Sequence, residues 1–148
     1  MLFLTSWLVS ISLALAVIGV PIPHNLSASS SGAILERGNV HYGDGTWYDV
    51  EGSQSACGWY NKNSDYVVAL DHATFDAHGD NYNNPLCGKK VIVWVEDGGH
   101  PKQEAKIVDR CSGCKTNDLD MSEALFKATI GDPGIGRARI AWVYADGS

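Results

Sequence analysis

The sequence predicts a small, mainly β domain that closes, or nearly closes, into a barrel and carries one or two short helices. Six short runs rich in Val, Ile, Trp and Tyr alternate with Gly, Asn, Asp and Pro, a pattern typical of strands separated by turns. Many strands with little helix favour a barrel. The expected strands are 46–50, 66–70, 91–96, 104–109, 118–121 and 139–144.

One stretch carries a convincing helix signal. Ser122 is a good N-cap residue, Glu123 suits the positive end of the first turn, and the apolar residues of 124–128 supply a packing face. The Gly-Asp-Pro-Gly run at 131–134 ends this helix. A shorter helical turn is expected over 72–76.

The 148-residue chain is expected to hold one folded domain, 39–148. Residues 1–20 are apolar and uncharged and contain small-x-small cleavage sites, which predicts a signal peptide. A membrane anchor is the alternative, but the apolar core is short and no basic stop-transfer cluster follows it. Residues 21–38 are rich in Pro and Ser, and we expect a disordered spacer there. The mature protein is therefore expected in the extracellular space or cell wall, without a membrane attachment.

Four cysteines in a secreted context indicate two disulfides that support a small core. Three pairings exist, and the short spacing of Cys111 and Cys114 favours a local bond that leaves Cys57 with Cys87. A zinc site is disfavoured because no second Cys-x-x-Cys motif is present, and a thioredoxin-type redox pair would need an α/β framework. No metal and no cofactor are expected.

The formal net charge of −6, without a Lys/Arg cluster, argues against nucleic acid, anionic membranes and strongly acidic polysaccharides as partners. A neutral ligand and a monomeric state are expected.

Two aspartates flank the loop that Cys111 and Cys114 would clamp. Asp109 ends an expected strand, and Asp120 precedes the helix start. Acids at strand ends beside a rigid loop can present polar chemistry in a groove; the alternative is a hydrogen-bonded pair that fixes Arg110 or backbone donors. His72, at the end of another strand run, is a candidate for the same groove.

Large aromatic residues are numerous for so small a domain: Trp47, Tyr48, Trp59, Tyr60, Tyr82, Trp94, Trp142 and Tyr144. Trp94 and Trp142 lie within strand runs and are expected in the core. Tyr48, Trp59 and Tyr60 lie near glycines and loops, so they are candidates for exposed rings that stack on sugars.

Taken in order, several short motifs resemble the double-psi β-barrel domain of expansins, barwin-like proteins and rare-lipoprotein-A-like proteins. The likeness is greatest to the fungal single-domain loosenins. The matching segments are 45–48, 56–58, 67–72, 84–88, 108–111 and 118–122. This resemblance implies a six-stranded barrel with an open groove across one face.

The resemblance also implies roles for single residues. Thr46, Asp109 and Asp120 match polar groove positions, and Asp120 corresponds to the general acid of endoglucanases built on this barrel. His72 matches a groove histidine of the bacterial members. Tyr48 stands where many expansins have a second small hydroxyl residue.

One departure bears on catalysis. The endoglucanases carry their base four residues after the threonine, and here that position is Val50. Asp49 precedes that position by one residue. Because side chains alternate between the two faces of a strand, Asp49 would point to the face opposite that of Thr46. Inverting hydrolysis needs a second carboxylate about 6.5–9.5 Å from the acid. Catalysis by Asp120 and Asp109 is therefore disfavoured.

The leading prediction is a secreted, non-hydrolytic polysaccharide-binding protein that loosens cell-wall networks of cellulose, chitin or a related glycan. Thr46, Tyr48, Trp59, His72, Asp109 and Asp120 are the expected binding residues. One alternative is a glycan-cleaving enzyme, a lytic transglycosylase or hydrolase, that uses Asp120. Another is a protease inhibitor or host-interaction protein of the barwin-like type, for which the tied loop 110–115 is suited.

Overall fold

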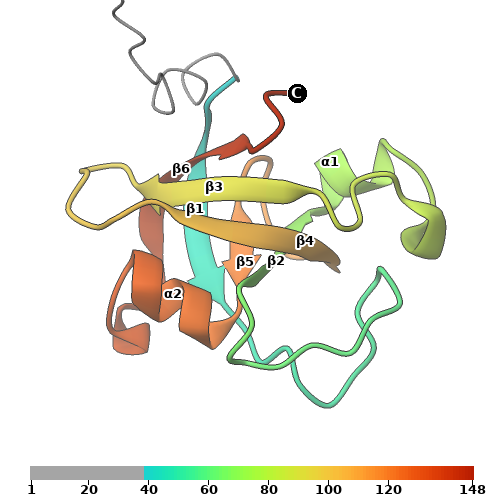
Figure 1. Cartoon of the computed structure of the whole chain (residues 1–148), viewed down its shortest axis with the longest axis horizontal. Coiled ribbons are helices and arrows are strands. Elements are labelled where there is room, and N and C mark those ends of the chain that lie inside the picture. Colours follow the sequence, from blue (N-terminus) through green and yellow to red (C-terminus); the bar gives the residue numbers. More distant parts are fainter. Residues whose placement is uncertain (1–38) are drawn as a thin grey trace, which may run out of the picture.

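The computed structural model describes residues 39–148; the expected signal peptide and spacer lie outside the described residues. Six strands form a closed barrel in the order β1-β5-β2-β4-β3-β6 (Figure 1). The strands are β1 (His41–Trp47), β2 (Val67–Asp71), β3 (Lys90–Val95), β4 (Gln103–Cys111), β5 (Leu119–Met121) and β6 (Ala138–Tyr144). The mainly β barrel predicted from the sequence is confirmed.

Parallel and antiparallel pairing are mixed in this barrel. β1 pairs with β5, and β2 pairs with β4, in parallel. The other four pairings are antiparallel. Since parallel strands need long connections, each parallel pair joins segments far apart in the chain. Groups on distant parts of the sequence therefore become neighbours across the sheet.

Two short α-helices and two 3₁₀ turns complete the described domain: α1 (His72–Asp76), α2 (Glu123–Thr129), η1 (Asn81–Asn83) and η2 (Pro133–Ile135). Ser122 caps α2 as predicted, because its hydroxyl accepts a hydrogen bond from the backbone N–H of Leu125. The predicted helical turn over 72–76 is α1. Among the described residues, no helix has the length and apolar character that crossing a membrane requires.

The core fills the barrel and the space beneath α2. Trp142, predicted for the core, is fully buried there, together with Phe126 and Leu125 of α2. Trp94 was expected in the core, and this expectation is wrong. Val93 points into the barrel, so the neighbouring Trp94 lies half-buried on the outer surface, with Lys102 Nζ 4.2 Å above its ring.

The first strand begins earlier and ends earlier than predicted. It covers 41–47 in place of 46–50 because Gly43 and Gly45, which suggest a turn, are strand residues paired with β6. A side chain on Gly43 would collide with the backbone carbonyl of Asn117, and one on Gly45 would meet Met121 Cε at 2.9 Å. These glycines are therefore explained by close approach of other segments.

Candidate functional site

Four residues lie in register across four neighbouring strands. Thr46 of β1 is opposite Asp120 of β5, Asp120 is opposite Ala69 of β2, and Ala69 is opposite Asp109 of β4. Directly opposed residues point to the same face of a sheet. We call this line the groove row; three strand spacings give it a length of about 14 Å.

A β-bulge places Asp109 in the groove row. Ile107 points into the core, so strict alternation would turn Asp109 inward as well. However, Val68 pairs with Ile107 while the next residue, Ala69, pairs with Asp109, which leaves Val108 as an extra residue. The inserted residue reverses the alternation and returns the Asp109 side chain to the outer face.

The groove row forms part of a hollow of about 520 Å³, a size suited to a small ligand. Its lining residues are Thr46, Trp47, Tyr48, Ala69, Asp109, Arg110, Cys111, Ser112, Gly113, Cys114, Asp120 and Arg137. The small side chain of Ala69 leaves the space between the two acids open. The groove is therefore polar, and Asp120 and Asp109 lie on either side of Ala69 at its base.

Asp120 is the acid whose protonation the surroundings favour. Its Oδ1 accepts a hydrogen bond from Thr46 Oγ1 at 2.6 Å. Burial raises the pKa of Asp120 above its usual value, and the nearby charge of Asp109 acts in the same direction. The Thr46 hydrogen bond and the charge of Arg137 act against this rise in pKa. Asp120 therefore keeps its proton to a higher pH than an exposed aspartate.

Asp109 is held by three donors of the protein. Its Oδ1 accepts hydrogen bonds from the backbone N–H groups of Ala56 and Arg110, both at 2.8 Å, and its Oδ2 accepts one from Tyr48 Oη at 3.2 Å. Burial, with the Asp109 charge, raises the pKa of Tyr48 far above its usual value, so Tyr48 stays a neutral donor. Both oxygens of Asp109 thus anchor the segment that follows β1.

The position expected for a catalytic base belongs to a packed residue. Val50 is buried with Val67 and Val108 in a small apolar cluster outside the barrel. Asp49 is exposed, and its Oδ1 accepts hydrogen bonds from the backbone of Glu51 and from Asn63 Nδ2. Asp49 does not line the groove.

Two disulfides, Cys57–Cys87 and Cys111–Cys114, have the pairing that the sequence favours. The second one closes the loop that forms a wall of the groove. Among the described residues, Cys111, Cys114 and Asp120 are the one cluster whose donor atoms lie close enough together for a metal ion. Because both sulfurs are bonded to each other, neither is the thiolate that a metal would need.

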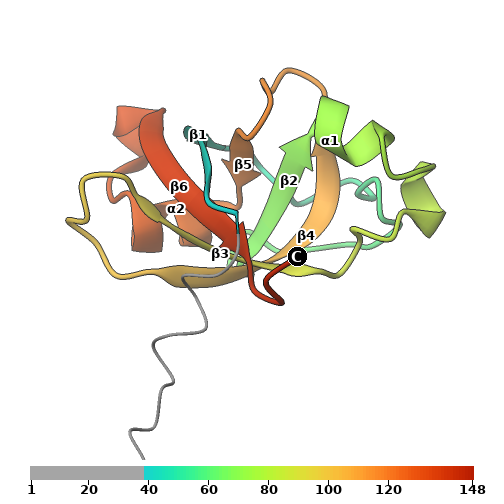
Figure 2. The ribbon, with the colours of Figure 1, turned by 90° about the horizontal axis from the view of Figure 1, so that it is seen from above.

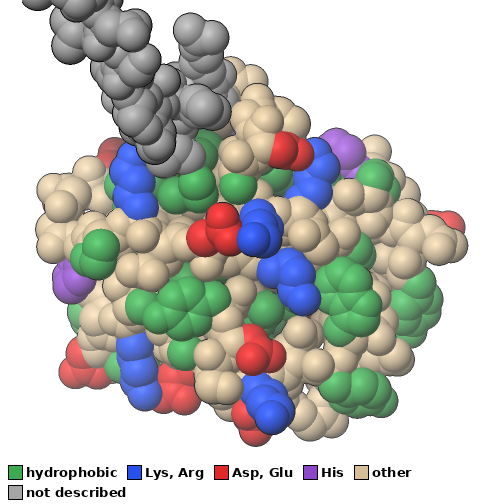
Figure 3. All heavy atoms as spheres, viewed as in Figure 1, with side chains coloured by type: hydrophobic (Ala, Val, Ile, Leu, Met, Phe, Trp, Pro, Cys, Tyr) green, Lys and Arg blue, Asp and Glu red, His purple; other side chains and the backbone are tan. Residues whose placement is uncertain are grey.

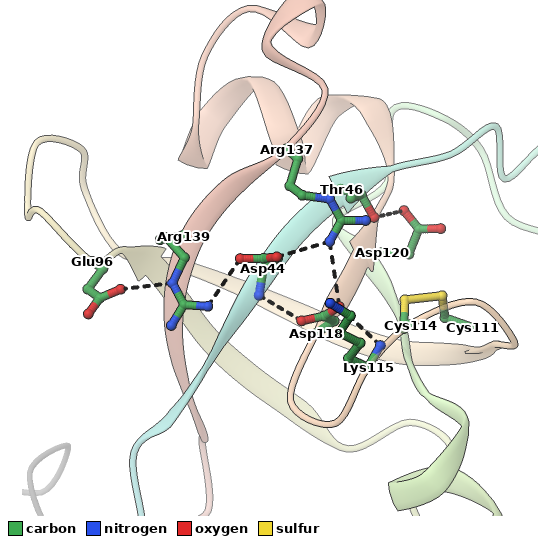
Figure 4. A network of polar contacts seen from close by, with 10 residues as sticks. All are labelled: Asp44, Thr46, Glu96, Cys111, Cys114, Lys115, Asp118, Asp120, Arg137 and Arg139. Atoms are coloured by element: carbon green, nitrogen blue, oxygen red, sulfur yellow. Dashed lines mark hydrogen bonds and ion pairs between the residues drawn. A yellow bond between two sulfur atoms is a disulfide. The ribbon is translucent and has the colours of Figure 1, made fainter.

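A network of ion pairs beside the groove was not predicted (Figure 4). Arg137 lines the groove and lies 3.1 Å from Asp44 and 3.6 Å from the buried Asp118. Arg139 also pairs with Asp44, at 3.1 Å. Arg139 lies on β6 and Arg137 just before this strand, so their shared contact with Asp44 depends on the register of β1 against β6.

His72 and Trp59 do not line the groove. His72 is the first residue of α1, and its Nδ1 is buried without a hydrogen-bond partner in the described part of the chain. Trp59 is 39% exposed, and Lys106 Nζ lies 4.8 Å above its ring. The other four predicted binding residues lie together in the groove: Thr46, Tyr48, Asp109 and Asp120.

Comparison with solved structures identifies the fold. A papain inhibitor from Streptomyces superposes with a TM-score of 0.64 at 26% identity, over 72% of this chain and 94% of the inhibitor. An expansin from Clavibacter michiganensis, solved in complex with cellohexaose, gives a TM-score of 0.57 at 23% identity, over 72% of this chain and 50% of the expansin. This chain has the double-psi β-barrel fold of these proteins.

A longer curated relative also matches this chain. Allergen Asp f 7 of Aspergillus fumigatus is 35% identical over 124 residues, which cover 79% of this chain and 42% of the allergen. The chain therefore spans less than half the length of that relative. No family model matches the sequence.

Proposed function

We propose that this chain is a secreted polysaccharide-binding protein that loosens cell-wall glycan networks without cleaving them. The groove row carries the proposal, because it lines up a hydroxyl and two acids along about 14 Å of open sheet. An expansin that shares the fold was solved with cellohexaose, which supports a glycan as the ligand. The two disulfides agree with an extracellular location.

Binding in the groove would work through hydrogen bonds along the row. Sugar hydroxyls both donate and accept, so they can pair with Thr46 and Asp120 on one side of Ala69 and with the Tyr48–Asp109 pair on the other. These bonds would replace hydrogen bonds between neighbouring glycan chains. Loosening would then follow from competition for hydrogen bonds, with no covalent step.

The distribution of charge favours a neutral glycan such as cellulose or chitin. On the face shown in Figure 3, positive and negative side chains are interspersed among apolar and polar ones. The formal net charge of −6 would repel a strongly acidic polymer.

The environments of the two acids argue against hydrolysis. A hydrolase needs one carboxyl to donate a proton and a second one free to activate water or attack the sugar. Asp120 suits the first role because burial raises its pKa. Both oxygens of Asp109 are already bonded to protein donors, and Val50 stands at the position expected for a base.

Two other functions each have one supporting observation. The raised pKa of Asp120 also suits a lytic transglycosylase, which needs a single acid/base group and would release anhydro-sugar products. The papain inhibitor among the similar structures favours protease inhibition, with the tied loop 110–115 as the contact. An assay of papain activity tests the second alternative directly.

The test is to incubate the secreted protein with insoluble cellulose and with chitin, then measure bound protein, reducing ends and anhydro-sugars together. We expect binding without product, and extension of a loaded cellulose strip by the same protein. Asp120→Asn should weaken binding about tenfold or more, as for loss of a charged hydrogen-bonding group. Asp97→Asn, a change at an exposed turn, should bind normally. Product that disappears in Asp120→Asn would establish an enzyme, and failure to bind either polymer would overturn the proposal.

A further inference from the structure

A second hollow lies beside the groove, between the end of α1 and η1. Its volume is about 440 Å³, and its lining residues are Asp76, Gly79, Asp80, Asn81, Tyr82 and Asn83. We call it the 76–83 hollow. None of its residues lines the groove.

One ion pair forms the border between the two hollows. Arg110 lines the groove, and its Nε and Nη2 donate to the two carboxyl oxygens of Asp76 in the 76–83 hollow, both at 2.6 Å. Arg110 Nη1 also donates to Ser112 Oγ of the groove wall at 2.8 Å. Figure 2 shows α1 beside the end of β4, where this pair forms. The two hollows therefore meet at the Arg110–Asp76 pair.

Tyr82 gives the 76–83 hollow an exposed aromatic ring. The residue is 67% exposed, although its position is fixed by its neighbours. A Cβ on Gly58 would lie 2.8 Å from Tyr82 Cδ1, so the ring rests against the backbone of Gly58. Gly58 follows Cys57, whose disulfide to Cys87 ties the two segments together. The ring of Tyr82 is thus fixed in position but remains largely exposed to solvent.

We propose that the 76–83 hollow is a second saccharide subsite, so that the protein binds a linear glycan long enough to occupy both hollows. Tyr82 stacks on a sugar ring, because axial C–H groups meet the negative face of an aromatic ring. Asp80, Asn81 and Asn83 bring acceptors and amide donors that suit sugar hydroxyls. This inference rests on the proposed function, since it extends the same binding surface.

The composition of the hollow favours a neutral sugar over other ligands. Asp80 adds negative charge, and the charge of Arg110 is already paired with Asp76, so a phosphate or an acidic sugar would be disfavoured. The hollow is also polar around its single aromatic ring, unlike a site for an apolar molecule.

Titration calorimetry with oligosaccharides of different length tests this subsite. Cellotriose and cellohexaose, and the chitin oligomers of the same lengths, are the probes. We expect the longer oligomer of the series that binds to bind more tightly. Tyr82→Ala should weaken binding of the longer oligomer about three- to tenfold, the contribution expected of one aromatic stack, and leave the shorter one unchanged. Tyr82→Phe should retain tight binding because it keeps the ring.

Tyr60→Ala is the matched control, because Tyr60 is 76% exposed and lines neither hollow. Asp80→Ala provides a second probe of the hollow that leaves the ring against Gly58 in place. Equal affinity for both lengths, or equal loss for both in Tyr82→Ala, would overturn the second subsite while the groove stands. If no oligomer of either length binds, the proposed function fails together with it.

Discussion

Asp71→Ala should destabilise the domain because Asp71 joins α1 to the connection that follows the groove wall. Asp71 is fully buried. Its Oδ1 accepts a hydrogen bond from the backbone N–H of Thr74 at 2.9 Å and so caps α1. Its Oδ2 accepts one from the backbone N–H of Asn117 at 3.1 Å, in the connection between the groove wall and β5. Asn117 has a positive φ of 71°, so this bond holds an uncommon backbone conformation.

The cost can be estimated from the two bonds. Loss of a helix N-cap costs about 1 kcal/mol. The Asn117 N–H, a part-buried backbone donor, would lose its partner, which costs about 1–3 kcal/mol more. We therefore expect Asp71→Ala to lower the free energy of unfolding by about 2–4 kcal/mol. Asp71→Asn should lose less, because its amide retains one acceptor.

Urea unfolding followed by tryptophan fluorescence measures this difference. Asp97→Ala is the control, since Asp97 is exposed and its side chain only accepts a hydrogen bond from Gly99 within its own turn. The control should change stability by about 0.5 kcal/mol or less. A loss for Asp71→Ala no larger than that of the control would show that these two bonds do not stabilise the folded domain.

Three further predictions concern the barrel and the groove. Gly43→Ala should cost at least about 1–3 kcal/mol, because the new Cβ collides with the Asn117 carbonyl; an unchanged urea midpoint would contradict this close approach. Ala69→Leu should abolish retention on cellulose or chitin by filling the groove floor, while Ala69→Gly should retain it; normal binding by the Leu variant would place the glycan elsewhere. Burial raises the pKa of Asp120 above 3.8, so the folded state binds its proton more tightly than the unfolded state does. Wild type should therefore lose stability relative to Asp120→Asn as the pH rises above 3.8, and a constant difference across urea titrations at several pH values would contradict this shift.

Local signals in the sequence predicted most of the barrel. The runs over 66–70, 104–109 and 139–144 are rich in β-branched and apolar residues, and each lies within or next to an observed strand. The Ser122 cap located α2 for a similar reason, because a capping bond joins residues only three apart. The first strand was misplaced because its glycines are explained by segments more than seventy residues away.

The groove depends on pairings that local patterns do not contain. Asp109 and Asp120 were singled out by their places at strand ends, but the register that aligns both with Ala69 joins three separate segments. The bulge at Val108 reverses the alternation of side chains expected for a regular strand over β4. Trp59 was predicted as a binding residue from its place near glycines and loops. Such a place indicates that a side chain is exposed, but it does not indicate whether the side chain faces the groove.

Binding of a glycan along the groove row without cleavage is tested best by a nuclear magnetic resonance titration of the protein with the oligosaccharide series that binds. One experiment follows backbone amide shifts and the anomeric signals of the sugar over time. We expect shifts concentrated at Thr46, Ala69, Asp109 and Asp120, with anomeric signals that stay constant. Shifts centred elsewhere would contradict the groove row as the binding site, and new anomeric signals that grow with time would contradict binding without cleavage.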